Sequence, residues 1–125
     1  MNTTVYRSVK LVVQNSTNES LSVQGVAVLK GRWADKMEPP QGGIIKEQSA
    51  VEWKSVSTEL GTGTSGFLRL GSSHGYLTLK WGAPWTGRFS HHVSRVNGLT
   101  TETEIDDSQP DSVVMTIAIS SERKK

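Results

Sequence analysis

Residues 5–13 read VYRSVKLVV, and this stretch decides the fold class. With Arg7 as the exception, its odd positions from Val5 to Val13 are apolar, and its even positions are mostly polar. Side chains of a strand point alternately to its two faces, so a period of two predicts a β-strand with one buried face. We therefore expect a strand that covers the core of a sheet protein.

Similar segments follow along the chain. They are LSVQGVAV (21–28), GIIK (43–46), VEWKSVS (51–57), GFLRL (66–70), YLTLKW (76–81), residues 88–96, and the alternating residues Val113, Met115, Ile117 and Ile119. Gly25 shifts the alternation by one residue, which predicts a β-bulge. The sequence NSTN (15–18) favours a turn, after which we expect the second strand to pair back on the first.

Turn residues separate these segments at short intervals, and MEPPQGG (37–43) predicts an exposed loop because prolines lack the backbone donor. No segment has convincing helical periodicity with caps. Many short strands of this kind predict an all-β protein. We expect residues 1–125 to form one antiparallel β-sandwich domain.

Composition restricts the class of function. The chain has 125 residues, no cysteine and a net charge of +2, so packing alone must stabilise it. Its basic residues are scattered, which disfavours nucleic acid as a partner. No apolar run has the length of a membrane span or of a signal peptide. We expect a soluble protein, cytoplasmic on synthesis, that leaves its cell without an ordinary secretory signal and acts at target membranes.

Catalytic, metal and cofactor sites are not predicted. His91 and His92 are adjacent and would point to opposite faces of a strand, so they cannot share one ion without a break in it. GTGTSG (61–66) lacks the lysine and the helix of a phosphate-binding loop. The acidic segment TTETEIDDSQPD (100–111) predicts a solvated loop, and calcium binding there stays an open alternative. We expect no enzyme.

The aromatic residues are the remaining candidates. Residues 76–92 read YLTLKWGAPWTGRFSHH and hold two of the four tryptophans. Trp53 and Trp81 alternate with apolar strand residues, which predicts burial, complete or partial. Trp33 and Trp85 lie beside chain breakers and therefore near loops, with Arg32 and Arg88 close by in sequence. These two rings either plug the ends of the sandwich or bind a ligand at a membrane interface.

The order of these features resembles the aegerolysin family and its bacterial crystal-associated and insecticidal relatives. LVVQNSTNESLSVQ (11–24) resembles the first two strands and the turn of that family, and LKGRW (29–33) a strand end with tryptophan. GTGTSGFLRL (61–70) and LKWGAPWTG (79–87) resemble its most recognisable elements. The resemblance implies an actinoporin-type β-sandwich that binds membrane lipids, often sphingolipids, with or without cholesterol. It also implies a cytolysin or toxin component that acts with a larger pore-forming partner protein.

By position, the resemblance maps a lipid-binding aromatic rim onto Trp33, Trp81 and Trp85, with Tyr6 and Phe89 as neighbours. Arg32 and Arg88, close in sequence to Trp33 and Trp85, are the basic residues expected to contact lipid phosphate. This chain differs from lipid-reading members in having Thr62 where an acidic residue precedes the glycine-rich turn, with Glu59 three residues earlier. The alternative is a carbohydrate-binding lectin of the actinoporin-like type, which GTSGFLRL (63–70) resembles. A lectin would present a single stacking ring beside carboxylate or amide groups, whereas a membrane reader would present several rings at one end. The oligomeric state is not predicted.

Overall fold

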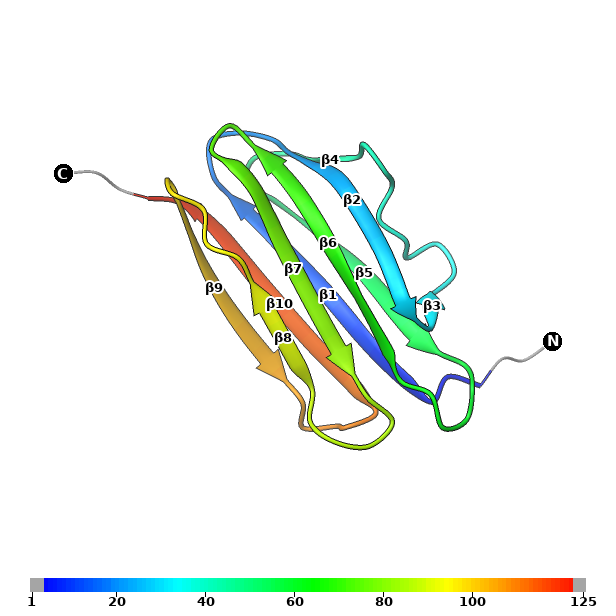
Figure 1. The fold of residues 1–125 in the computed structure, drawn as a ribbon. Helices are drawn as coiled ribbons and strands as arrows, with labels where there is room; N and C mark the ends of the chain where they lie inside the picture. The colour runs from blue at the N-terminus through cyan, green and yellow to red at the C-terminus, as the bar shows by residue number, and fades with distance from the viewer. Residues whose placement is uncertain (1–3, 123–125) are drawn as a thin grey trace.

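The protein is a sandwich of two five-stranded sheets (Figure 1). The computed structural model describes residues 4–122. One sheet has the strand order β3-β5-β1-β10-β9 and the other β4-β2-β6-β7-β8. The strands are β1 (Arg7–Ser16), β2 (Leu21–Lys30), β3 (Arg32–Trp33), β4 (Ile44–Ile45), β5 (Ser49–Ser57), β6 (Thr64–Ser72), β7 (Gly75–Ala83), β8 (Ser90–Val93), β9 (Leu99–Asp106) and β10 (Ser112–Ser121).

The predicted all-β sandwich is confirmed. Residues 4–122 contain no helix, and their strand pairs are antiparallel except that β1 runs parallel to β10. Alternation places one face of each long strand in the core, where Val9, Leu11 and Val13 of β1 are at most 1% exposed. Trp53 is buried as its alternation predicts, at 7% exposure. Burial of these apolar faces against each other is what holds the two layers together.

The expected hairpin between the first two strands is wrong. β1 pairs with β5 and β10, whereas β2 pairs with β4 and β6 in the opposite sheet. Each strand has one apolar face, and the two faces meet across the core instead of lying side by side. Asn15, 1% exposed, holds the crossing: its Oδ1 accepts the Thr17 N–H at 3.0 Å, and its Nδ2 donates to the Ile45 carbonyl at 3.0 Å.

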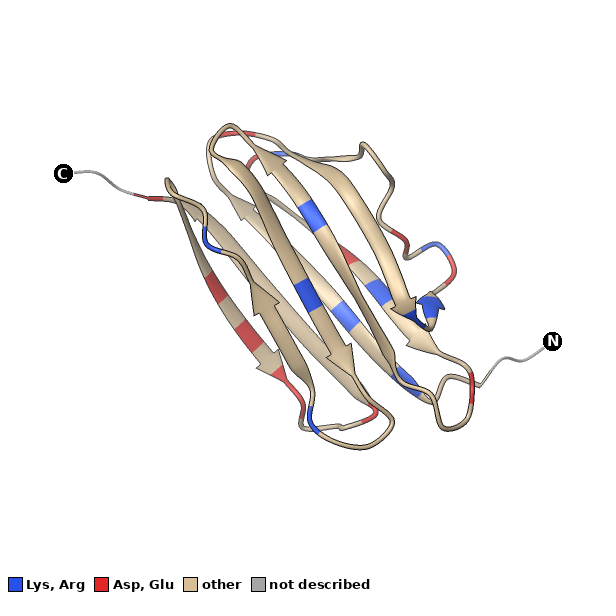
Figure 2. Cartoon of the chain, in the orientation of Figure 1, with Lys and Arg blue, Asp and Glu red and all other residues tan. Residues whose placement is uncertain are grey.

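The acidic segment 100–111, predicted as a loop, is strand over residues 100–106 and loop only over residues 107–111. β9 is an edge strand that pairs with β10, and Figure 2 shows its acidic residues along the outer edge. Half-buried Thr101, Thr103 and Ile105 form its inner face, while Glu102 and Glu104 are exposed. An edge strand needs only one modestly apolar face, and threonine methyl groups supply most of it. Charges on the other face suit an unpaired edge.

Two glycines shape the other sheet. The predicted bulge at Gly25 is confirmed by a register shift between Val23 and Gly25 in the β2–β6 pairing. Gly31 has φ of 84°, and a Cβ there would lie 2.3 Å from the Val56 carbonyl oxygen. Only glycine tolerates both conditions, and it lets the chain turn from β2 into β3. Residues 37–43 form the predicted loop, in which Pro39 is buried.

Candidate functional site

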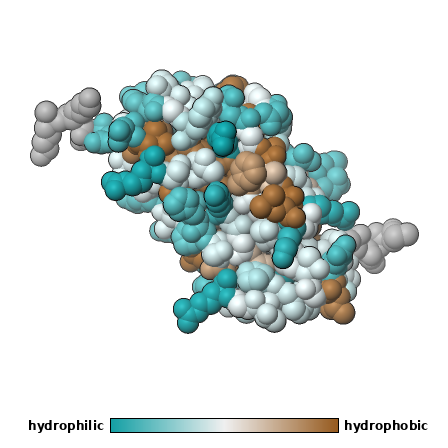
Figure 3. Space-filling model, in the orientation of Figure 1, coloured by the Kyte–Doolittle hydropathy of each residue, from teal (hydrophilic) through white to brown (hydrophobic). Residues whose placement is uncertain are grey.

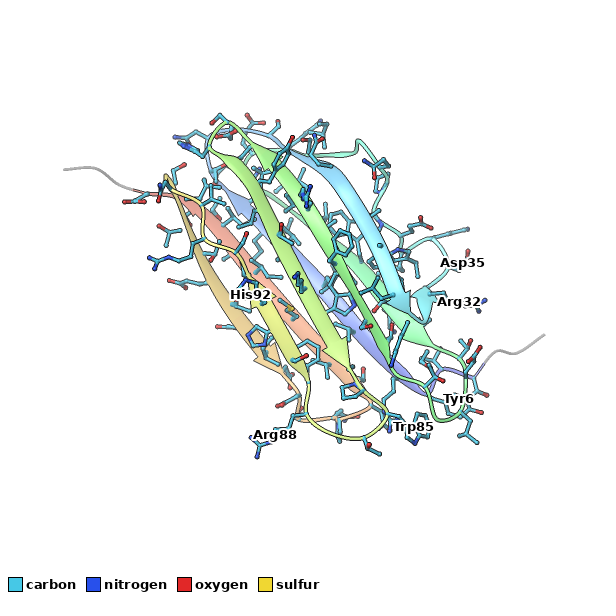
Figure 4. All side chains as sticks on the ribbon, viewed as in Figure 1. Tyr6, Arg32, Asp35, Trp85, Arg88 and His92 are labelled. Atoms are coloured by element: carbon cyan, nitrogen blue, oxygen red, sulfur yellow. The ribbon has the colours of Figure 1, made fainter. Side chains whose placement is uncertain are left out.

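One end of the sandwich gathers aromatic and aliphatic side chains from three segments. We call it the aromatic end: residues 4–7, the β5–β6 loop (58–63) and the β7–β8 loop (84–89). Figure 4 shows Tyr6 and Trp85 close together there. Their ring centroids are 5.9 Å apart with an interplanar angle of 64°, an edge-to-face arrangement. Both side chains are half-buried, so each ring keeps some surface in contact with solvent.

Arg7 fixes this pair. Its guanidinium lies 4.2 Å from the Trp85 ring centroid, and its Nη2 donates to the Trp85 carbonyl at 2.8 Å. Nη1 donates to the Tyr6 carbonyl at 2.8 Å and lies 3.3 Å from an Asp111 carboxylate oxygen. A planar guanidinium can stack on a ring and donate in its own plane, which lysine cannot do. Arg7 therefore ties the β7–β8 loop to the N-terminal segment.

A groove of about 720 Å³ lies beside these rings. It runs between the two loops, and its lining residues include Lys30, Glu59, Thr62, Thr64, Ser65, Pro84, Trp85, Arg88 and Ser90. Gly63 lets the loops approach, because a Cβ there would lie 2.2 Å from the Ala83 carbonyl oxygen. The buried Ser57 hydroxyl donates to the Thr62 carbonyl and holds the β5–β6 loop in place.

The groove carries charges of both signs. Lys30 and Arg88 bring ammonium and guanidinium groups, and Glu59 brings a carboxylate. Hydroxyl groups such as those of Thr62 and Ser90 can donate or accept hydrogen bonds. A ligand with separated positive and negative groups and a neighbouring apolar part would find a complementary surface here.

Apolar surface surrounds the groove. Leu60, at the tip of the β5–β6 loop, is 73% exposed, Val5 is 48% exposed, and Leu29, next to groove-lining Lys30, is 70% exposed. Figure 3 shows hydrophobic atoms over the end of β2 and at the corner near the N-terminal segment. A leucine that is mostly exposed at a loop tip contributes little to the core. Such a residue is free to contact a membrane or a partner.

Trp81 and Trp33 form a second aromatic pair, away from the groove. Their ring centroids are 5.6 Å apart. Trp81 is 3% exposed, and its Nε1–H donates to the Ser55 hydroxyl at 2.9 Å. The burial that alternation predicts for Trp81 is therefore confirmed. Its assignment to a surface site by resemblance is corrected, because its indole N–H is already bonded and almost none of its surface is exposed. Trp33 is half-buried against it, and Arg32 is exposed on the sheet edge (Figure 4).

The remaining predicted residues lie at or near the aromatic end. Arg88 is exposed and lines the groove. Phe89 packs against the core with part of its ring, which stacks on His91 at 5.9 Å. His91 and His92 are exposed on the edge strand β8. Tyr6, Trp85 and Arg88 are thus brought to one end. Arg32 lies beside that end, where it lines a small pocket with Glu59 and Thr62 of the β5–β6 loop, whereas Trp33 and Trp81 form a separate pair.

Two contributors to the aromatic end were missed in the sequence. Arg7 is the one charged residue among the apolar odd positions of residues 5–13, but its contact with Trp85 joins residues 78 positions apart and has no local signal. Leu60 left a readable signal, because TELGTG (58–63) places one leucine among turn residues. An apolar residue in such a turn has no strand or helix to carry it into the core.

Within the part of the chain that the structure describes, no three His, Asp or Glu side chains are grouped to hold a metal ion. Among the same residues no helix has the length and apolarity to cross a membrane. Asp106 belongs to the acidic segment, and hydrogen bonds from the Ser108 hydroxyl and backbone N–H lower its pKa.

Comparison with known proteins supports the fold. No family model and no curated protein sequence matches the chain. Among solved structures, that of the lipid-binding protein Nakanori is similar, with a TM-score of 0.75 and 10% sequence identity. The match covers 95% of this chain and 73% of that chain. At this identity the likeness shows a shared β-sandwich fold.

Proposed function

We propose that this protein binds membrane lipids by docking its aromatic end on the bilayer surface. The observation that carries the proposal is the gathering of Tyr6, Trp85 and exposed Leu60 at one end, around a groove with Lys30 and Arg88. Aromatic and aliphatic side chains enter the headgroup region while cations contact phosphate. The shared fold with a protein described as lipid-binding supports the same function.

The headgroup we propose is the phosphocholine of a sphingolipid, with cholesterol as a second component of the membrane. The groove beside Trp85 offers Arg88 and Lys30 to the phosphate, and Glu59 with the indole ring to the quaternary ammonium. Its volume of about 720 Å³ suits a headgroup. The resemblance to aegerolysins supports the sphingolipid class.

We further propose that the protein is the lipid-reading component of a cytolysin or toxin and that a larger partner protein opens the membrane. The segments at the aromatic end are short loops tied down by Arg7 and Ser57. They present Val5, Leu60 and parts of the Tyr6 and Trp85 rings, which is enough apolar surface for shallow docking. With this protein alone, we expect binding to sphingomyelin–cholesterol vesicles without rapid release of an entrapped dye.

Vesicle sedimentation tests the docking site. Trp85→Ala and Leu60→Ala should each weaken binding to sphingomyelin–cholesterol vesicles about tenfold or more, because burying an apolar side chain contributes roughly 1.5–3 kcal/mol. Ile44→Ala is the matched control, since Ile44 is 58% exposed on β4, outside the aromatic end. An equal loss of vesicle binding in Leu60→Ala and Ile44→Ala would overturn the proposal that the aromatic end faces the bilayer.

The salt dependence separates the apolar from the electrostatic contribution. Each basic residue near an anionic surface adds about 1 kcal/mol, and salt screens that attraction. Ring and leucine burial is unaffected by screening, so binding should survive an increase from about 0.1 M to about 1 M salt, where the Debye length falls to roughly 3 Å. Release at high salt would show that charge attraction holds the protein on the vesicle.

A further inference from the structure

A second groove lies at the opposite end of the sandwich. It has a volume of about 540 Å³ and lies beside the β6–β7 hairpin. Its lining residues are Glu19, Ser20, Ser22, Gln24, Gly71, Ser72, Ser73, Gly75 and Tyr76. Gly71 lies in the floor, where the Gln24 and Ser22 side chains pack over it: a Cβ there would lie 2.9 Å from both the Gln24 Cγ and the Ser22 Oγ. The groove is a depression on the outer face of the sheet.

An exposed aromatic ring forms one wall. Tyr76 is 61% exposed and lies opposite Gly71 in the β6–β7 pairing. The Arg69 guanidinium lies 5.5 Å from the centroid of its ring. Arg69 does not line the groove, so it supports the ring from outside. A large, supported and exposed ring is a ready stacking surface, with few torsions to freeze on binding.

The other walls carry an ionised carboxylate, an amide and hydroxyl groups. Glu19 accepts hydrogen bonds from the Ser73 N–H at 2.7 Å and the Ser73 hydroxyl at 2.6 Å, one on each oxygen. Each oxygen keeps a further lone pair, and the carboxylate side chain is 30% exposed. Gln24 donates to the Ser22 hydroxyl at 2.6 Å, which leaves its amide oxygen and its second N–H free to bind a ligand.

We propose that this groove binds the pyranose ring of a neutral carbohydrate. One face of a pyranose presents C–H groups that stack on an aromatic ring, and its hydroxyls need acceptors and donors at the edge. Tyr76 supplies the ring, Glu19 the acceptors, and Gln24 both kinds of group. The lining residues include a carboxylate and no Lys or Arg, so phosphorylated and acidic sugars are disfavoured.

The two grooves lie far enough apart that each can bind its own ligand at the same time. β6 runs from Thr64, in the first groove, to Ser72, in the second. Eight strand steps of about 3.3 Å place them roughly 26 Å apart. Figure 1 shows the β6–β7 hairpin and the β7–β8 loop at opposite ends of the sheet. A protein docked by its aromatic end would therefore hold the sugar groove away from the bilayer, open to a glycan on another molecule.

A panel of free monosaccharides tests the proposal: D-glucose, D-galactose, D-mannose, L-fucose, N-acetylglucosamine and N-acetylgalactosamine. In amide NMR titrations of the full chain, at least one sugar should shift the signals of Gly71, Ser73 and Gly75 with saturation. Tyr76→Ala should weaken that sugar's binding about tenfold or more, and Tyr76→Phe should keep it within about threefold, because stacking needs the ring and not the hydroxyl. Glucose 6-phosphate should bind more weakly than glucose.

Trp85→Ala is the control, since it removes a ring of similar kind at the other end. It should lower vesicle binding and leave sugar binding unchanged, whereas Tyr76→Ala should do the reverse. The titration of the unmodified chain remains decisive if Tyr76→Ala fails to fold. No saturable shift with any sugar, or shifts confined to the aromatic end, would overturn the sugar groove while leaving the lipid proposal to its own test.

Discussion

At each end of the sandwich one charged side chain joins two separate segments, and the charge is positive at one end and negative at the other. At the aromatic end, the Arg7 guanidinium stacks on Trp85 and donates to its carbonyl, which ties a loop to the N-terminal segment. At the hairpin end, the Glu19 carboxylate accepts two hydrogen bonds from Ser73, which ties the β6–β7 hairpin to the β1–β2 turn. A cation therefore holds an apolar surface at one end, and an anion holds a hydroxyl-rich surface at the other.

This difference separates what each end can bind. Rings, leucine and basic groups suit a bilayer surface, whereas a carboxylate, an amide and one ring suit a polyol. The core between the ends is common to both, and it includes Trp81, only four residues before Trp85. The contrast between these two tryptophans shows which part of the aromatic cluster serves the fold and which part is free for binding.

Trp81→Ala should have the largest effect on stability. The substitution removes a buried ring and leaves the Ser55 hydroxyl without the indole N–H it accepts. We expect the free energy of unfolding to fall by about 3–5 kcal/mol, measured by urea denaturation. Trp85→Ala should cost about 1–2 kcal/mol, because part of that side chain is already exposed. Equal losses of unfolding free energy in Trp81→Ala and Trp85→Ala would mean that Trp85 is a core residue that closes the end of the sandwich.

Alternation made the core strands predictable from sequence. β1, β7 and β10 place apolar residues at successive second positions, and a period of two fixes both the element and its buried face. In β5 the same alternation holds for Val51 and Trp53 and continues in the buried hydroxyls of Ser55 and Ser57. β9 was missed because its inner face is made of threonines between glutamates, a pattern that composition alone assigns to a loop. The pairing of β1 was wrong because alternation says which face is buried and not which strand lies beside it.

The candidate site was predictable only where local chain geometry decides it. Pro84 and Gly87 bracket Trp85 and prevent a continued strand, so its place in an end loop followed from sequence. The contact with Arg7 did not, since it depends on how the sheets bring residues 7 and 85 together. Trp81 was assigned to the surface by position in a resemblance, and its hydrogen bond to Ser55 shows why it lies inside.

Arg7→Lys should have an intermediate effect and sharpen the comparison at the aromatic end. Lysine keeps the positive charge but loses the planar group that stacks on Trp85 while donating to two carbonyls. We expect a loss of about 1–2 kcal/mol in the free energy of unfolding. Arg69→Lys is the matched control, because Arg69 lies over Tyr76 on the exposed sheet face and makes the looser contact of 5.5 Å. It should cost less than about 0.5 kcal/mol. Similar losses of unfolding free energy in the two variants would show that the contacts of Arg7 with Trp85 and Tyr6 depend on charge alone.

The smallest expected effect is at the hairpin end and depends on pH. The Ser73 hydroxyl and then its N–H lower the pKa of Glu19 below its ordinary value of 4.5, with His74 at 3.8 Å a minor contributor. A carboxylate with a lowered pKa in the folded state stabilises the fold above its unfolded pKa and loses that contribution as the pH falls through the folded pKa.

The measurement compares the urea midpoint of the protein with that of Glu19→Gln from about pH 7 to about pH 3. The protein should be slightly more stable than the variant near neutrality, and the difference should shrink below about pH 4.5, whereas the contribution of Asp106, whose pKa is also lowered, is the same in both chains. A difference that stays constant across this range would mean that the ionised carboxylate does not hold the hairpin, and the opposition between the two ends would then rest on Arg7 alone.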